Sequence, residues 1–212
     1  MRTLARSDDS RSALRAATLV LVPRRPRIDA PGAIQHVVAK GNAGAPIVAD
    51  DRDREVLVTR IGEAIHRHGW SCLAYCLLDT HFHLVVATRD GNLGAGMKWL
   101  LGPYAQGFNF RHGRQGHLFR GRFYSRRIET ENHLIAALVY VSLNPVRAGV
   151  VLRPESWRWS SYAVTIGRKV SPSFVDVRAV LDLIDPHPRT AQLAFELAVR
   201  ETRERDSTPT GV

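Results

Sequence analysis

The stretch that decides the fold runs Trp70-Ser-Cys-Leu-Ala-Tyr-Cys-Leu-Leu-Asp-Thr-His-Phe-His-Leu-Val-Val-Ala-Thr88. It contains two mostly apolar runs, 70–78 and 82–88, rich in the residue types that strands favour. Only Asp79 and Thr80 separate the first run from the His-Phe-His segment. A connection this short predicts a hairpin, so at least part of the sheet should be antiparallel.

Two histidines occupy alternate positions at the start of the second strand. Side chains two residues apart on a strand share a face and lie roughly 6.5 Å apart along the chain. His81 and His83 can therefore lean toward one metal ion, while Phe82 points into the opposite layer. A single histidine on a strand is more often a hydrogen-bonded structural residue, so this pair needs support from elsewhere in the chain.

That support begins 57 residues after His83, at Tyr140-Val-Ser-Leu-Asn144-Pro145. A spacing of four places Tyr140 and Asn144 on one face of a helix. The apolar stripe of this helix is formed by Leu134, Leu138 and Val141. Tyr140 and Asn144 flank the stripe, and Pro145 is expected to end the helix.

A strand packed beside this helix would bring two imidazoles, an amide and a phenol around one divalent ion. Such a set predicts a tyrosine nucleophile aimed at a metal-polarised phosphodiester. Each residue also has a plainer interpretation: Tyr140 as a core or rim aromatic, Asn144 as a helix-ending residue. The joint pattern is what favours an enzyme that cuts nucleic acid and stays attached to it.

The charge of the chain favours a polyanionic partner. There are 30 Lys and Arg against 20 Asp and Glu, giving a formal charge of +10 and a pI near 10.5. Between residues 111 and 127 there is no acidic residue, and Phe119, Phe123 and Tyr124 are interspersed among basic side chains. The six arginines of this segment are Arg111, Arg114, Arg120, Arg122, Arg126 and Arg127. Arginines mixed with aromatics are typical of surfaces that hold phosphates and stack bases, although a basic loop on a solvated face would look the same.

Taken together, the ordered motifs resemble the single-tyrosine HUH transposases, specifically their REP-associated branch. The resemblance runs from about Pro26 to Val164. It rests on the motifs Pro31-Gly-Ala-Ile-Gln-His-Val-Val-Ala-Lys-Gly-Asn42, Asp50-Asp51-Arg52-Asp53-Arg54, Gly69 to His83, Gly116-His-Leu-Phe-Arg-Gly-Arg-Phe123, Tyr140 to Val150 and Trp157-Arg-Trp-Ser-Ser-Tyr162. The arginine-rich stretch before Pro26 and the tail after Val164 match no family motif.

The resemblance implies an α+β fold, in which helices flank an antiparallel sheet with the HUH strand at its centre, as in a ferredoxin-like sandwich. It implies that His81, His83 and Asn144 hold a divalent metal, Mg²⁺ or Mn²⁺. It also implies that Tyr140 is the nucleophile of a transposase that cuts and rejoins single-stranded DNA beside a REP-like hairpin, through a 5′-phosphotyrosine. The protein would act as a monomer or a homodimer in the bacterial cytoplasm, near the nucleoid.

Two other classes of function remain open at this point. One is a nucleic-acid-binding regulator that no longer cuts. The other is a metal-dependent nuclease that uses activated water, in which Tyr140 is only structural. HUH nucleases of replication or conjugation would share the same chemistry.

The remaining pattern predicts the other elements. They are a strand at 33–39, a helix capped by Asp51 that runs to His68 and stops at Gly69, a helix at 92–108 interrupted at Gly102-Pro103, a strand near 122–128, a cap at Thr130, and helices at 174–184 and 189–203. The expected organisation is a flexible basic tail at 1–25, a catalytic domain at 26–168, a helical extension at 169–205 and a disordered tail at 206–212. Cys72 and Cys76 are expected to be buried thiols, and no stretch reaches the ~20 apolar residues of a membrane span.

Overall fold

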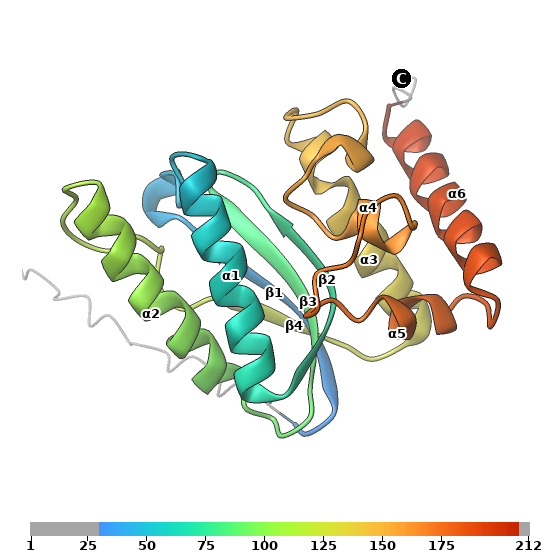
Figure 1. Ribbon diagram of the computed structural model, residues 1–212, viewed down its shortest axis with the longest axis horizontal. Helices are drawn as coiled ribbons and strands as arrows, with labels where there is room; N and C mark the ends of the chain where they lie inside the picture. The colour runs from blue at the N-terminus through green and yellow to red at the C-terminus, as the bar shows by residue number, and fades with distance from the viewer. Residues whose placement is uncertain (1–29, 208–212) are drawn as a thin grey trace, which may run out of the picture.

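Four antiparallel strands in the order β2-β3-β1-β4 form the central sheet. The computed structural model describes residues 30–207 (Figure 1). The strands are β1 (Ala33–Lys40), β2 (Trp70–Leu77), β3 (His81–Thr88) and β4 (Tyr124–Ile128). The predicted hairpin is confirmed, with Cys76 opposite His83 and Leu77 opposite Phe82. The His-Phe-His strand is therefore central, with a paired neighbour on either side.

Helices cover both faces of this sheet, so the predicted α+β architecture is confirmed (Figure 1). The helices are η1 (Asn42–Gly44), α1 (Asp51–His68), α2 (Leu93–Arg111), α3 (Glu131–Arg147), η2 (Pro154–Ser156), α4 (Tyr162–Thr165), α5 (Val177–Asp182) and α6 (Pro188–Ser207). Figure 1 shows α1 and α2 on one side of the sheet and α3 to α6 on the other. Within residues 30–207, no helix is both long enough and apolar enough to cross a membrane.

Alternate side chains of β3 point to opposite faces of the sheet, and each face packs on a different apolar cluster. Phe82, Leu84 and Val86 are buried in the apolar cluster shared with α1 and α2. Val85 belongs to the second cluster, which contains α3 and the C-terminal helices. His81 and His83 have the same parity as Val85, so they face α3. The C-terminal helices contribute Val180, on α5, and Phe195 and Val199, on α6, to this second cluster.

Two prolines, Pro103 and Pro145, were expected to interrupt or end a helix, but each lies inside one. Pro103 lies in the middle of α2, where the preceding Gly102 has no Cβ to clash with the proline ring. Pro145 lies in α3, which continues to Arg147. The helix survives because proline removes only its own N–H, and Ala148 N still donates to Asn144 O at 2.9 Å. Gly149, with φ of 69°, follows the helix end.

The start of α1 differs from the prediction by one residue. Asp50, not Asp51, is the N-cap: its backbone is extended and its side chain accepts a hydrogen bond from Asp53 N. Gly69 ends the helix in the left-handed conformation, and Thr130 caps α3, both as predicted. The shift of the α1 start follows from having two adjacent aspartates that could each serve as the cap.

The predictions for the two tails and the two cysteines have different outcomes. The predicted N-terminal tail at 1–25 lies outside the described residues, as do residues 208–212. Asp206 and Ser207, assigned from the sequence to a tail, are the last residues of α6. Cys72 and Cys76 are buried free thiols, and burial raises the pKa of Cys72 to about 12.

Candidate active site

The two histidines of β3 lie side by side under α3. Their ring centroids are 5.0 Å apart, His83 is only 3% exposed, and His81 is partly exposed. Burial is the main cause that lowers the pKa of His83 to about 2, and repulsion from the protonated forms of His36, His81 and Lys40 contributes. Burial also lowers the pKa of His81. Both imidazoles are therefore neutral at physiological pH, which is the form that binds metal ions.

Tyr140 and Asn144 come from α3, one helical turn apart. Asn144 is 7% exposed, and its Nδ2 donates to Tyr140 O at 3.2 Å. Its side chain also makes a polar interaction with His81 and His83, which favours their charged forms and partly offsets the effect of burial. The Tyr140 ring lies 5.7 Å from the His83 ring, centroid to centroid. The structure thus brings together all four residues that the sequence predicts for the site.

A further histidine, to which the sequence assigned no role, holds His83 in place. His36 Nε2, on β1, and His83 Nδ1 share a hydrogen bond at 2.9 Å. Thr80 Oγ1 makes a similar contact with His81 Nδ1 at 3.0 Å. The period of β1 places His36 on the face of Val38 and Lys40, but which strand pairs with β1 cannot be read from the sequence.

The donor atoms fit a divalent ion that substrate helps to hold. His83 Nε2 is buried and has no hydrogen-bond partner among the described residues. Within residues 30–207, no three His, Cys, Asp or Glu side chains are grouped as a metal site. Any ion here would therefore be held by His81 and His83 together with a neutral amide, Asn144. Such a set leaves positions for phosphate oxygens and water.

A cavity of about 510 Å³ opens beside this group. Its lining includes His83 and Tyr140 together with the basic side chains Lys40, Arg120 and Arg122. All three basic residues are exposed. The cavity therefore combines the buried, neutral imidazole of His83 with exposed, positively charged side chains.

The six arginines of the basic segment do not share one surface. Arg120 and Arg122 line the cavity, and Arg126 lies opposite His36 in the β1–β4 ladder, hence on the same face. Arg127 lies opposite Gln35 and so faces the other side. Binding of nucleic acid by all six arginines stays a prediction. The strand register places Arg126 and Arg127 on opposite faces of the sheet.

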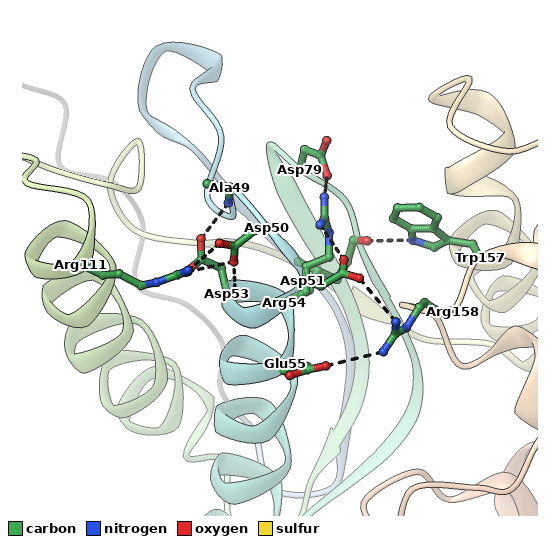
Figure 2. A network of polar contacts seen from close by, with 11 residues as sticks. Ala49, Asp50, Asp51, Asp53, Arg54, Glu55, Asp79, Arg111, Trp157 and Arg158 are labelled. Atoms are coloured by element: carbon green, nitrogen blue, oxygen red, sulfur yellow. Dashed lines mark hydrogen bonds and ion pairs between the residues drawn. The ribbon is translucent and has the colours of Figure 1, made fainter.

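Arg111 and Arg114 have partners within the protein. Arg111 forms ion pairs with Asp50 and Asp53 at the start of α1 (Figure 2). The hydrogen bonds from Arg111 hold the pKa of Asp50 well below its usual range. The Arg114 guanidinium lies over the Phe108 ring at 5.5 Å. Both arginines thus support the α1–α2 side of the molecule, opposite to α3.

A polar network fixes the hairpin that carries the histidines. Figure 2 shows Arg54 between Asp51, in its own helix, and Asp79, two residues before His81. Trp157 Nε1 donates to the backbone oxygen of Leu77 at 2.9 Å, on the other arm of the hairpin. The turn is therefore held from two sides before any substrate binds.

Arg147 is a second residue that the sequence did not single out. It follows Tyr140 by seven residues, about two helical turns, so both share a face of α3. Its guanidinium carbon lies 5.0 Å from the centroid of the Tyr140 ring. Its Nε and Nη2 donate to Asp206 Oδ2, on α6, at 2.9 and 2.7 Å. The C-terminal helix is thereby connected to the candidate nucleophile.

Comparison with known proteins bears on the fold. The sequence matches no protein-family model, and no curated protein is significantly similar to it. A solved structure of a REP-associated tyrosine transposase bound to a REP hairpin is similar over 70% of this chain and 87% of its own, with a TM-score of 0.57 and 16% sequence identity. The chain has the fold of that transposase.

A second solved structure, of a putative transposase from Deinococcus radiodurans R1, is similar over 60% of this chain and 92% of its own. The TM-score is 0.40 and the sequence identity 15%. The fold is established by the first of these structures alone. The roles of individual residues rest on the geometry of the site.

Proposed function

We propose that this protein is a metal-dependent endonuclease and strand transferase, a transposase acting on single-stranded DNA next to a hairpin. The observation that carries the proposal is the juxtaposition of an exposed tyrosine with two neutral imidazoles, one buried and one partly exposed, and a buried amide. Tyr140 is 43% exposed, whereas His83 and Asn144 are buried. The shared fold with a REP-associated tyrosine transposase, whose structure contains a REP hairpin, supports this choice of substrate.

The chain's own residues account for substrate binding and for the nucleophile. Lys40, Arg120 and Arg122 line the cavity and would hold phosphates next to Tyr140. The Tyr140 oxygen would attack phosphorus and the bond from phosphorus to the 3′ oxygen would break. A 5′-phosphotyrosine forms, and the leaving 3′ oxygen takes up a proton in exchange for the phenolic one.

Rejoining is the same exchange in reverse, with a different 3′ hydroxyl as attacker. One phosphoester replaces another at each step, so no nucleotide triphosphate is needed. A divalent ion held by His81, His83 and Asn144 would supply Lewis acidity to a phosphate oxygen. The imidazoles remain neutral because burial lowers their pKa values, and His36 and Thr80 orient their rings.

The test uses single-stranded hairpin DNA from the flanks of the protein's own gene, labelled at either end. We expect a covalent adduct that survives denaturing electrophoresis and carries the 3′ label, while the 5′ label appears on a shorter free strand. EDTA should abolish it and Mn²⁺ restore it. Protein attached to the 5′-labelled fragment, cleavage without any adduct, or cleavage unaffected by EDTA would each contradict the proposal.

A further inference from the structure

A second cavity lies beside the histidine pair, and the proposed reaction assigns no part of the DNA to it. Its volume is about 610 Å³. It is lined by Lys40 at the end of β1, by the loop 41–44 that follows, by Thr80 and His81 of the hairpin, and by Arg120. It is thus built from three separate segments that meet at the start of β3.

The two cavities meet at shared residues and differ in what else they contain. Lys40 and Arg120 line both. Tyr140 and His83 line only the first, and His81 lines only the second. Because the two histidine rings are 5.0 Å apart, both cavities adjoin one small group of donor atoms.

The loop that lines the second cavity adopts a sterically restricted conformation. A Cβ on Gly41 would come within 1.9 Å of Ala45 O. Ala43, the one residue other than glycine with positive φ in the described chain, has a φ of 50°. Gly41 N donates to Thr80 O at 2.8 Å and Asn42 N to Leu118 O at 2.9 Å. Backbone strain of this kind persists where the surroundings enforce it, and it clusters at functional sites.

We propose that this second cavity binds the nucleotide that carries the leaving 3′ hydroxyl, and afterwards the 3′ end of the strand to be joined; this inference rests on the proposed function. Displacement at phosphorus needs the attacking and leaving oxygens roughly in line, on opposite sides of the phosphorus. Tyr140 approaches from the first cavity, so the leaving oxygen points toward the second. Lys40 and Arg120, shared by both cavities, are positioned for the phosphates at the junction.

Asn42 supplies the polar chemistry of a nucleotide site. Its exposed side chain lines only the second cavity. An amide offers both donors and an acceptor, which suits the edge of a base or a sugar oxygen. It contributes to neither the histidine group nor the tyrosine, so it can be replaced without altering the reacting atoms.

The test follows the joining step separately from the cutting step. The covalent adduct is formed on hairpin DNA, and the rate of joining is measured against the concentration of an added single-stranded oligonucleotide with a free 3′ hydroxyl. Asn42→Ala should raise the half-saturating concentration about tenfold, roughly the loss of one or two hydrogen bonds. The maximal joining rate should change little. Asn42→Asp, which keeps the shape but adds a negative charge, should raise the half-saturating concentration further.

Arg122→Ala is the contrasting variant, because Arg122 lines only the tyrosine-side cavity. It should weaken binding of the hairpin DNA before cleavage without changing the half-saturating concentration of the added strand. If the adduct forms but both Asn42 variants join strands with the wild-type concentration dependence, the inference is overturned while the proposed function stands. If the wild-type protein forms no adduct, both are overturned.

Discussion

Exposure narrows the choice of nucleophile to two tyrosines. The chain has five, and Tyr75, Tyr104 and Tyr162 are buried. Only Tyr140, at 43%, and Tyr124, at 61%, are exposed, and both line the first cavity. Of the two, Tyr140 lies on the helix that also brings Asn144 to the histidines, whereas Tyr124 lies on the edge strand β4.

Tyr140→Phe is therefore expected to abolish covalent attachment while leaving DNA affinity nearly unchanged, because only one exposed hydroxyl is lost. Denaturing gels of the adduct and a binding titration measure the two effects separately. Tyr124→Phe is the matched control and should keep the adduct. An adduct that persists in the Tyr140 variant and disappears in the Tyr124 variant would move the nucleophile to β4.

His36 is expected to set the metal affinity of His83 without touching the ion. If His83 Nε2 binds the metal, its Nδ1–H must donate to His36 Nε2, which fixes one tautomer for each ring. His36→Phe keeps a ring but removes the acceptor, and it should weaken Mn²⁺ binding by about 10–100-fold. Calorimetric titration measures the affinity, and thermal unfolding checks the fold.

His36→Gln provides the rescue, because its side-chain oxygen can accept the same hydrogen bond. It should recover much of the affinity that His36→Phe loses. Equal Mn²⁺ affinity in the wild type and in both variants would show that His36 only packs against His83.

At the residue scale, sequence spacing was enough to find candidate site residues that lie on the same strand or the same helix. The period of a strand identified His81 and His83, and the period of a helix identified Tyr140 and Asn144. His36 could not be found this way, since its role depends on β1 pairing with β3 in a particular register. The spacing of Arg147 from Tyr140 could have placed both on one helix face. Its contact with Asp206, 59 residues further along the chain, could not be predicted from spacing.

At the scale of elements, the apolar pattern predicted every strand and every long helix of the described chain, but not all of their ends. The proline rule placed an interruption at Gly102-Pro103 and a helix end at Pro145, and tertiary packing overrode it in both cases. Buried neighbours explain this: Leu100 and Tyr104 flank the first proline and Leu143 precedes the second. Burial of such side chains outweighs the single hydrogen bond that each proline removes.

The basic segment gives the prediction that belongs to this scale. Replacing Arg120, Arg122 and Arg126 by Ala should lower the affinity for single-stranded DNA of any sequence. It should also flatten the log–log salt dependence by about one unit per lost phosphate contact. These side chains face the site, so their charges are available to phosphates.

The matched control takes two arginines of the same segment that face elsewhere, Arg114 and Arg127. Arg114 lies over Phe108, and Arg127 is on the opposite face of β4. Replacing both by Ala should leave the salt slope close to that of the wild type. A slope that falls equally in both sets of variants would show that charge alone, and not its position on the sheet, determines binding.

At the scale of the whole molecule, the two faces of the sheet differ in what they carry. The α1–α2 face packs on a large apolar core, and the ion pairs of Arg111 join the two helices beside it. The other face carries the histidines and α3. Under the proposed function, the formal charge of +10 would steer DNA toward the protein, and the cavities would restrict where the strand is held.

The C-terminal helix α6 is the part of the molecule for which the sequence suggested no role, because nothing after Val164 resembles a family motif. The structure packs it on α3 and places Asp206 against Arg147. Arg147 lies over the face of the Tyr140 ring, where a cation is attracted to the π electrons. The helix is therefore connected to the phenol through one intervening side chain, and we expect it to restrain the orientation of the ring.

This arrangement predicts that α6 tunes the rate of attack by Tyr140. Asp206→Ala frees Arg147, so the phenol samples more orientations and adduct formation at saturating DNA should slow by up to about tenfold. DNA affinity should stay the same or rise slightly, since a negative charge is removed. Single-turnover adduct formation and a separate binding titration distinguish the two effects. Asp182→Ala, which breaks the exposed Arg178–Asp182 pair on α5, is the control and should change neither.

A double-mutant cycle decides whether Asp206 acts through Arg147. Arg147→Ala removes both the cation over the ring and the partner of Asp206, so adding Asp206→Ala to it should slow the reaction no further. Rates that multiply in the double variant would mean that the two residues act independently. A wild-type rate in Arg147→Ala would show that the ring is held by α3 packing alone and that α6 has no part in the reaction.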